Sequence, residues 1–246
     1  MNFLPGKPTL SILLAASFIG IGTASASTLG FTDNGNNGND LGTSFTENAG
    51  GVTATVKAFT FSDNSSDPSG TDANSTNMRA FGDNGIGIGN GDDPEHSANN
   101  QGGRELFLIE FSETVTLNNA SITEFGNDSD SNLGGDSDVE YWGGTGTFSF
   151  ENLGTRFEDG ILSDVLSDGQ QRNVSFDNGL GSISWLLFGP ESFDSSIGTL
   201  AAADYIKLRT IDFDVTAVPI PAAIWLMGSA LLSLAGLNRK RGKTIS

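Results

Sequence analysis

The 246-residue sequence contains 30 Asp and Glu against 12 Lys and Arg, together with 33 Gly, 17 Phe, a single His and no Cys. Its net charge of −18 disfavours nucleic acids and anionic lipid surfaces as partners. The absence of Cys excludes disulfide bonds, and a single His excludes zinc sites that need Cys or several His ligands.

Residues 1–26 have the three parts of a secretory signal peptide. Lys7 supplies the positive charge, an apolar run extends from Leu10 to Gly22, and small residues occupy Ala24 and Ala26. The apolar run is shorter than the roughly 20 residues that cross a bilayer. We therefore expect a signal peptidase to cleave after Ala26 and the mature chain to start at Ser27. The alternative is an uncleaved anchor.

Residues 27–217 carry the acidity of the protein. They hold all 30 carboxylates but only seven of the 12 cations, which gives this section a net charge of 7 − 30 = −23. The other five cations are Lys7, Arg239, Lys240, Arg241 and Lys243. A section of this length can form one domain with its own core. Divalent cations would relieve its self-repulsion, so Ca²⁺ is the cofactor that we expect.

The apolar residues of this section occur in short runs separated by turn-forming residues, which is typical of β-strands. Residues 51–61 alternate in polarity and then shift by one position, which predicts a β-bulge or the replacement of one strand by another. Residues 104–111 are apolar on both faces, which predicts a central strand. Asn118 and Asn119 are expected to form a hairpin or corner, and the pattern of residues 204–215 predicts another bulge.

Roughly eight to eleven such strands predict an all-β fold, a single β-sandwich of the jelly-roll kind. Residues 158–169 form a short helix or a turn in this interpretation. Trp185 lies in an apolar run and is expected in the core.

Two polar loops contain oxygen ligands at spacings that suit Ca²⁺. The first offers Asp83, Asn84, Asp92, Asp93 and Glu95 around a Gly-rich turn. The second offers Asp128, Asp130, Asn132, Asp136, Asp138 and Glu140. The second departs from an EF-hand loop, because Leu133 replaces the glycine and Val139 stands at the twelfth position. The alternative is that both loops are solvated acidic segments.

No catalytic residues are assigned. His96, the single histidine, lies in a polar loop, so a Ser-His-Asp site has little support. A pair of carboxylates for glycoside cleavage stays open, because nothing singles out two of the thirty acids. Tyr141 and Trp142 beside the second acidic loop are candidates for stacking on sugar rings if they are exposed.

Residues 218–246 form a tripartite segment. Val218, Pro219, Ile220 and Pro221 precede an apolar stretch to Leu237, and Arg239, Lys240, Arg241 and Lys243 follow it. The apolar part is long enough for a transmembrane helix, and the basic cluster would stay in the cytoplasm with the acidic domain outside. An ordinary C-terminal anchor is the alternative interpretation.

The segment "VPIPAAIWLMGSALLSLAGLNRKR" resembles the PEP-CTERM sorting signal of bacteria that make extracellular polysaccharide, in its Val-Pro-Leu-Pro-Ala variant. Ile220 replaces the Leu or Glu of the two best-known forms. The resemblance implies export by the Sec machinery and processing at the Pro-containing motif by an exosortase, an integral membrane protease. Residues 81–122 also resemble a segment of extracellular domains in this family, which implies a β-sandwich.

These features together predict a membrane-anchored precursor that becomes a surface or matrix protein. Its expected role is non-catalytic association with exopolysaccharide or a biofilm. A calcium-stabilised carbohydrate-binding module is the alternative, and a glycan hydrolase or lyase is the third possibility.

Overall fold

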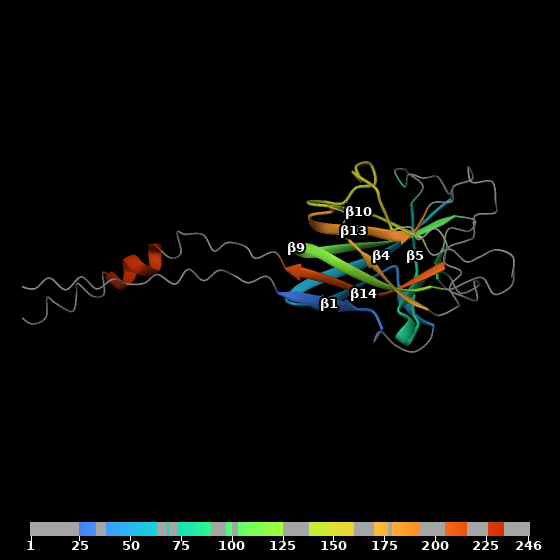
Figure 1. Cartoon of the computed structure of the whole chain (residues 1–246), viewed down its shortest axis with the longest axis horizontal. Coiled ribbons are helices and arrows are strands. Elements are labelled where there is room, and N and C mark those ends of the chain that lie inside the picture. The colour runs from blue at the N-terminus through green and yellow to red at the C-terminus, as the bar shows by residue number, and fades with distance from the viewer. Residues whose placement is uncertain are drawn as a thin grey trace, which may run out of the picture. The chain divides into compact units, whose positions relative to one another are not determined.

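The computed structural model describes residues 25–32, 38–62, 68, 73–89, 97–99, 103–124, 138–159, 170–176, 179–191, 205–215 and 226–233. Contacts divide the chain into a unit spanning Ala24–Thr216 and a second unit formed by the two terminal segments. The described part of the second unit is one helix over residues 226–233. All described strands lie in the first unit (Figure 1).

The strands are β1 (Ala26–Gly30), β2 (Asn39–Gly42), β3 (Ser44–Ala49), β4 (Val52–Phe61), β5 (Asn74–Thr76), β6 (Met78–Ala80), β7 (Ile86–Ile88), β8 (Ala98–Asn99), β9 (Arg104–Glu124), β10 (Val139–Gly144), β11 (Phe157–Asp159), β12 (Gln171–Ser175), β13 (Ser182–Pro190) and β14 (Tyr205–Val215). A 3₁₀ turn, η1 (Gly82–Asn84), precedes β7. The strands form one antiparallel hydrogen-bonded network, so the predicted all-β, sandwich-like fold is confirmed.

Strand β9 organises the fold. Its first part, from Arg104 to Phe111, pairs with β4 and β13, and its second part, from Val115 to Glu124, pairs with β14 and β12 and, at Val115 and Thr116, with the start of β13. The register with β13 shifts where the two parts meet. The strand therefore passes from one group of strands to another, and the described side chains between these groups form the main core.

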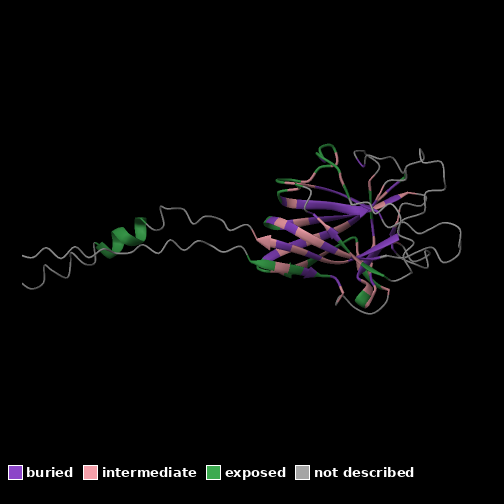
Figure 2. Ribbon diagram, in the orientation of Figure 1, coloured by how far each residue is buried: buried purple, intermediate pink, exposed green. Residues whose placement is uncertain are grey.

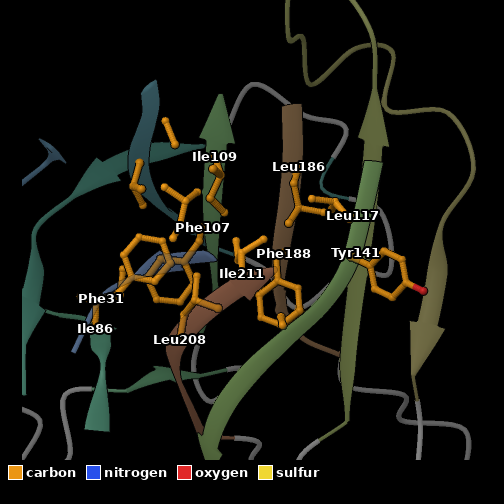
Figure 3. Packing of buried hydrophobic residues seen from close by; sticks show 14 of the residues in the cluster. Phe31, Ile86, Phe107, Ile109, Leu117, Tyr141, Leu186, Phe188, Leu208 and Ile211 are labelled. Atoms are coloured by element: carbon orange, nitrogen blue, oxygen red, sulfur yellow. The ribbon is translucent and has the colours of Figure 1, made fainter. Parts of the chain in front are cut away.

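The main core draws on both parts of β9 and on the strands that flank them. Phe107 and Ile109 converge with Leu186 of β13 and with Leu208 and Ile211 of β14 (Figure 3). All of these side chains are buried, as is most of β9, β13 and β14 (Figure 2). Burial of each such side chain contributes about 1.5–3 kcal/mol, so this cluster is a main source of stability.

A second apolar cluster covers the opposite face of β9 and its neighbours. Leu106 and Leu108 of β9 lie there with Trp185 of β13, and residues 145–156 pack over them through Phe148 and Phe150. We call residues 145–156 the covering segment. The predicted central strand with two apolar faces is thus confirmed, and Trp185 is a core residue as expected.

The covering segment also explains why the bulge predicted in residues 51–61 is wrong. Strand β4 pairs with β9 without any register shift from Ala54 to Phe61. Val56 and Ala58 face the main core, whereas Phe59 and Phe61 contact Phe150 of the covering segment. The change in pattern therefore reflects a second buried face and not an inserted residue.

The hairpin expected at Asn118 and Asn119 is also wrong, because both residues lie inside β9. The register with β14 shifts at this point, since Asp212 pairs with Asn119 and Phe213 pairs with Leu117. The extra residue is accommodated as an irregularity in one strand. The bulge expected in residues 204–215 is confirmed by a different register shift, between Leu208 and Thr210, which places the extra residue in β14.

Candidate functional site

The described residues contain a cleft of about 330 Å³ at one end of the β domain. It is lined by Thr60, Phe61, Ser62, Asn74, Asn99, Gly103 and Glu105. These residues come from the ends of β4, β5, β8 and β9 and from the turns beside them. The lining combines hydroxyl, amide and carboxylate groups with one aromatic ring, which is typical of a polar ligand site.

Glu105 and Asn99 are joined directly at this cleft. The Oε2 atom of Glu105 accepts hydrogen bonds from the backbone N of Asn99 at 3.1 Å and from its Nδ2 at 3.0 Å. Asn99 itself pairs with Tyr205, the first residue of β14. The short strand β8 therefore fixes the carboxylate of Glu105 through both its backbone and its side chain.

Gly103 allows two chain segments to approach closely beside the cleft. A Cβ atom at this position would lie 2.6 Å from the carbonyl oxygen of Phe61. Real Cβ atoms do not come this close to backbone oxygen, so any other residue would push β4 and β9 apart at the point where Phe61 pairs with Arg104.

The first predicted calcium loop is described only at Asp83 and Asn84, which lie in η1. The carbonyl oxygen of Asp83 accepts a hydrogen bond from Nε of Arg209 at 2.8 Å, so this turn is attached to β14. Asp92, Asp93 and Glu95 lie outside the described residues, and so does His96. Within the described ranges no group of three or more His, Cys, Asp or Glu side chains is placed to bind a metal ion.

The second predicted loop is described only at Asp138 and Glu140, while Asp128, Asp130, Asn132 and Asp136 lie outside the described residues. Glu140 is 0% exposed and forms ion pairs with Arg104 and with Arg156, the latter at 3.3 Å. Its two carboxylate oxygens thus each contact a guanidinium group. The assignment of Glu140 as a calcium ligand is therefore wrong, because this carboxylate already neutralises buried positive charge.

Tyr141 and Trp142 do not present their rings to solvent. Tyr141, which is labelled in Figure 3, is 0% exposed. Its ring contacts those of Phe157 and Phe176, and its hydroxyl donates to the carbonyl of Ser175 at 3.4 Å. Trp142 is 3% exposed, with the guanidinium of Arg104 over its ring. The expectation that they stack on sugars is wrong, because alternate positions of a strand covered on both faces are all buried.

The residues of the terminal signals are described only in part. Ala26 begins β1, whereas Ala24, the motif from Val218 to Pro221, and Arg239, Lys240, Arg241 and Lys243 lie outside the described residues. Leu226, Met227, Leu231 and Leu232 of the helix are exposed. Among the helices that the structure describes, none has the length and apolar character needed to cross a membrane.

Sequence reasoning did not identify the cleft. Asn74, Asn99 and Glu105 are common polar residues in separate segments, and no spacing connects them. The pairing of β4 with β9 and of β8 with β14 brings them together. The sequence signal nearest to the cleft was Glu105, which directly precedes the apolar run of residues 106–109 in the predicted central strand.

No family model matches the sequence, and no curated protein matches it. A solved structure, that of a DUF4465 family protein from Bacteroides ovatus ATCC 8483, is similar over 77% of this chain and 99% of that chain. Its sequence identity is 14% and its TM-score is 0.31.

Proposed function

We propose that the protein is exported, processed by an exosortase, and held at the cell surface or in the extracellular matrix, where it associates with exopolysaccharide without catalysing a reaction. The observation that carries this proposal is the tripartite pattern of residues 218–246 together with the signal-peptide pattern of residues 1–26. The pairing of β1 with β14, in which Ser27 lies opposite Phe213, is compatible with it. The first and last strands of the β domain are neighbours. The first and last described residues of the domain therefore lie side by side.

The cleft lies at the other end of the same strands. Asn99 pairs with Tyr205, where β14 begins, and β14 ends at Val215 beside β1. Eleven residues of extended strand span about 33 Å, so the cleft is about 30 Å from the residues at which the β domain begins and ends. The cleft and the residues at which the β domain begins and ends therefore lie at opposite ends of β14.

The composition of the terminal segments supports the rest of the proposal. Sec-dependent export would use residues 1–26, and the precursor would be anchored in the inner membrane through a helix within residues 218–246 until the exosortase acts. The described helix exposes Leu226, Met227, Leu231 and Leu232. A bilayer would bury these four side chains. The transmembrane helix and the jelly-roll strand order are both parts of this proposal.

A calcium-stabilised carbohydrate-binding module is the second candidate function. The charge of −23 on residues 27–217 favours bound cations, and the cleft offers a polar site for a sugar. Loss of saccharide binding after calcium chelation would favour this module. A glycan hydrolase or lyase is the third candidate, and release of a defined product from purified polysaccharide would support it.

The sorting proposal is tested in the native host with the double variant Pro219→Ala, Pro221→Ala. We expect the wild-type protein outside the inner membrane and the variant retained in it, because the exosortase would lack its motif. Thr147→Ala in an exposed turn of the β domain serves as the control and should be released like the wild type. Release of the double variant at the wild-type level would contradict processing at this motif.

A further inference from the structure

We propose that the cleft between β4, β5, β8 and β9 binds a neutral saccharide, with the carboxylate of Glu105 accepting hydrogen bonds from its hydroxyl groups. The inference names the ligand class for the exopolysaccharide association proposed above and rests on that function. It assigns the binding role to residues other than Tyr141 and Trp142, whose rings are buried.

The chemistry of the lining suits sugar hydroxyl groups. Each sugar hydroxyl both donates and accepts a hydrogen bond. The lining contains the amides of Asn74 and Asn99, which are groups that donate and accept hydrogen bonds, and the carboxylate of Glu105, which accepts them. A volume of about 330 Å³ is within the range of small-ligand sites.

The acceptor group is fixed before any ligand arrives. Asn99 donates two hydrogen bonds to Oε2 of Glu105, so the orientation of the carboxylate is already determined. Thr60 contacts the carbonyl of Asn74 at 3.5 Å, which connects β4 to β5 on another side of the cleft. A preorganised site loses less conformational entropy on binding than a mobile one.

Phe61 gives the cleft an apolar component. This residue lines the cleft, belongs to the second apolar cluster and is 7% exposed. Sugar rings combine polar hydroxyl groups with apolar C–H groups. The combination of one aromatic ring with convergent amide and carboxylate groups matches both.

The negative charge at and around the cleft favours a neutral sugar over an acidic one. A carboxylate at the site and a net charge of −23 over residues 27–217 repel uronates and sulfated sugars. A divalent cation is a poorer match, because the described lining contains Glu105 as its sole carboxylate. The described residues elsewhere contain no group of three acidic or histidine side chains that would hold one.

The test measures saccharide binding by the full chain with isothermal titration calorimetry. The protein is purified in a polyoxyethylene detergent, which has no sugar headgroup. The ligands are oligosaccharides released by mild acid from the polysaccharide that the native host secretes, separated by anion exchange into neutral and acidic pools. We expect the neutral pool to bind and the acidic pool to bind at least about tenfold more weakly.

Two substitutions on the same strand locate the site. Glu105→Gln should weaken binding by about tenfold or more, because a charged hydrogen-bond acceptor is lost. Glu110→Gln removes the same charge from β9 at a partly exposed position paired with Lys57, and binding should stay within about twofold of the wild type. Hydrogen exchange of the wild type should slow on ligand addition in peptides that contain Thr60–Ser62 and Asn99–Glu105.

The proposal is overturned if neither pool binds, if the acidic pool binds as well as the neutral pool, or if the two substitutions have equal effects. Protection from exchange at a different surface would also overturn it. Calorimetry uses purified protein, so its result is independent of sorting. A correctly processed protein that fails to bind would remove the saccharide site and leave the proposed export and processing intact.

Discussion

Ala26 lies opposite Asp214 in the antiparallel pair of β1 and β14, and the amide of Val215 donates to the carbonyl of Ser25 at 3.3 Å. The register continues without a shift to Gly30 and Thr210. The first strand of the domain is therefore added to its last strand. Because the two strands are so far apart in the sequence, this contact forms only when the whole domain is available for folding.

Leu29→Ala should destabilise the domain by about 2–5 kcal/mol. Leu29 is 1% exposed in β1, and its truncation leaves a cavity in the main core. Thr28→Ala on the same strand is the control, because Thr28 is exposed. It loses only the hydrogen bond from its hydroxyl to Asp212, so the free energy of unfolding should fall by about 1 kcal/mol or less. Urea denaturation measures both. Equal midpoints for the two variants would show that β1 is not part of the stable domain.

Glu140→Gln should cost about 3–5 kcal/mol, because it leaves the buried guanidinium of Arg104 without its countercharge. Glu158→Gln removes the other partner of Arg156, but this pair lies at the surface and should contribute about 0–1 kcal/mol. Thermal unfolding at fixed pH compares the two. A Glu140 variant as stable as the Glu158 variant would contradict the assignment of Arg104 and Glu140 as a buried pair.

Gly85→Ala should be among the most damaging single-methyl changes in the domain. Gly85 has φ +91, and a Cβ atom there would lie 2.2 Å from the carbonyl oxygen of Leu208, so strain and a steric clash combine to cost about 3 kcal/mol or more. Gly146→Ala at φ +83 has no atom within 4 Å and should cost about 1 kcal/mol from backbone strain alone. Chemical denaturation tests the difference. Comparable losses would mean that η1 does not pack on β14 as described.

Phe150→Ala should loosen the covering segment and expose Trp185. Phe150 contacts Phe59, Phe61 and Phe148, and Phe148 packs on the Trp185 ring. We expect a red shift of the tryptophan emission together with a loss of about 3 kcal/mol in stability. Thr147→Ala, an exposed position in the same segment, should change neither quantity. An unchanged emission spectrum for Phe150→Ala would show that this aromatic ring does not shield Trp185.

The sequence pattern was sufficient to predict the central strand and the all-β class, because runs of apolar residues separated by Gly, Asn and Asp are specific for strands. It was insufficient for β4 and for Tyr141 and Trp142. In both places the misleading feature was a second buried face. Phe148 and Phe150 of the covering segment cover that face at β4 and at Trp142, whereas Tyr141 lies in the main core against Phe157 and Phe176. The alternation of the strand itself does not record either contact.

The candidate site was less predictable than the fold. The two acidic loops were predicted to bind a cation because the spacing of their carboxylates suits one. Glu140 of the second loop instead forms ion pairs with the guanidinium groups of Arg104 and Arg156. Asn99 reaches Glu105 at the cleft because it belongs to β8, a strand of only two residues. Such a strand carries no periodicity, so its hydrogen bonds to Glu105 can be known only from the three-dimensional structure.

The most direct test of the proposed function is the intact mass of the protein recovered from its native host, combined with cell fractionation. We expect a chain that starts at Ser27 and ends near Pro219 or Pro221, recovered outside the inner membrane. Such a product would mean that both terminal signals are removed from the β domain. A mass that extends through Ser246 in the inner-membrane fraction would contradict exosortase processing and reduce the C-terminal segment to a simple anchor.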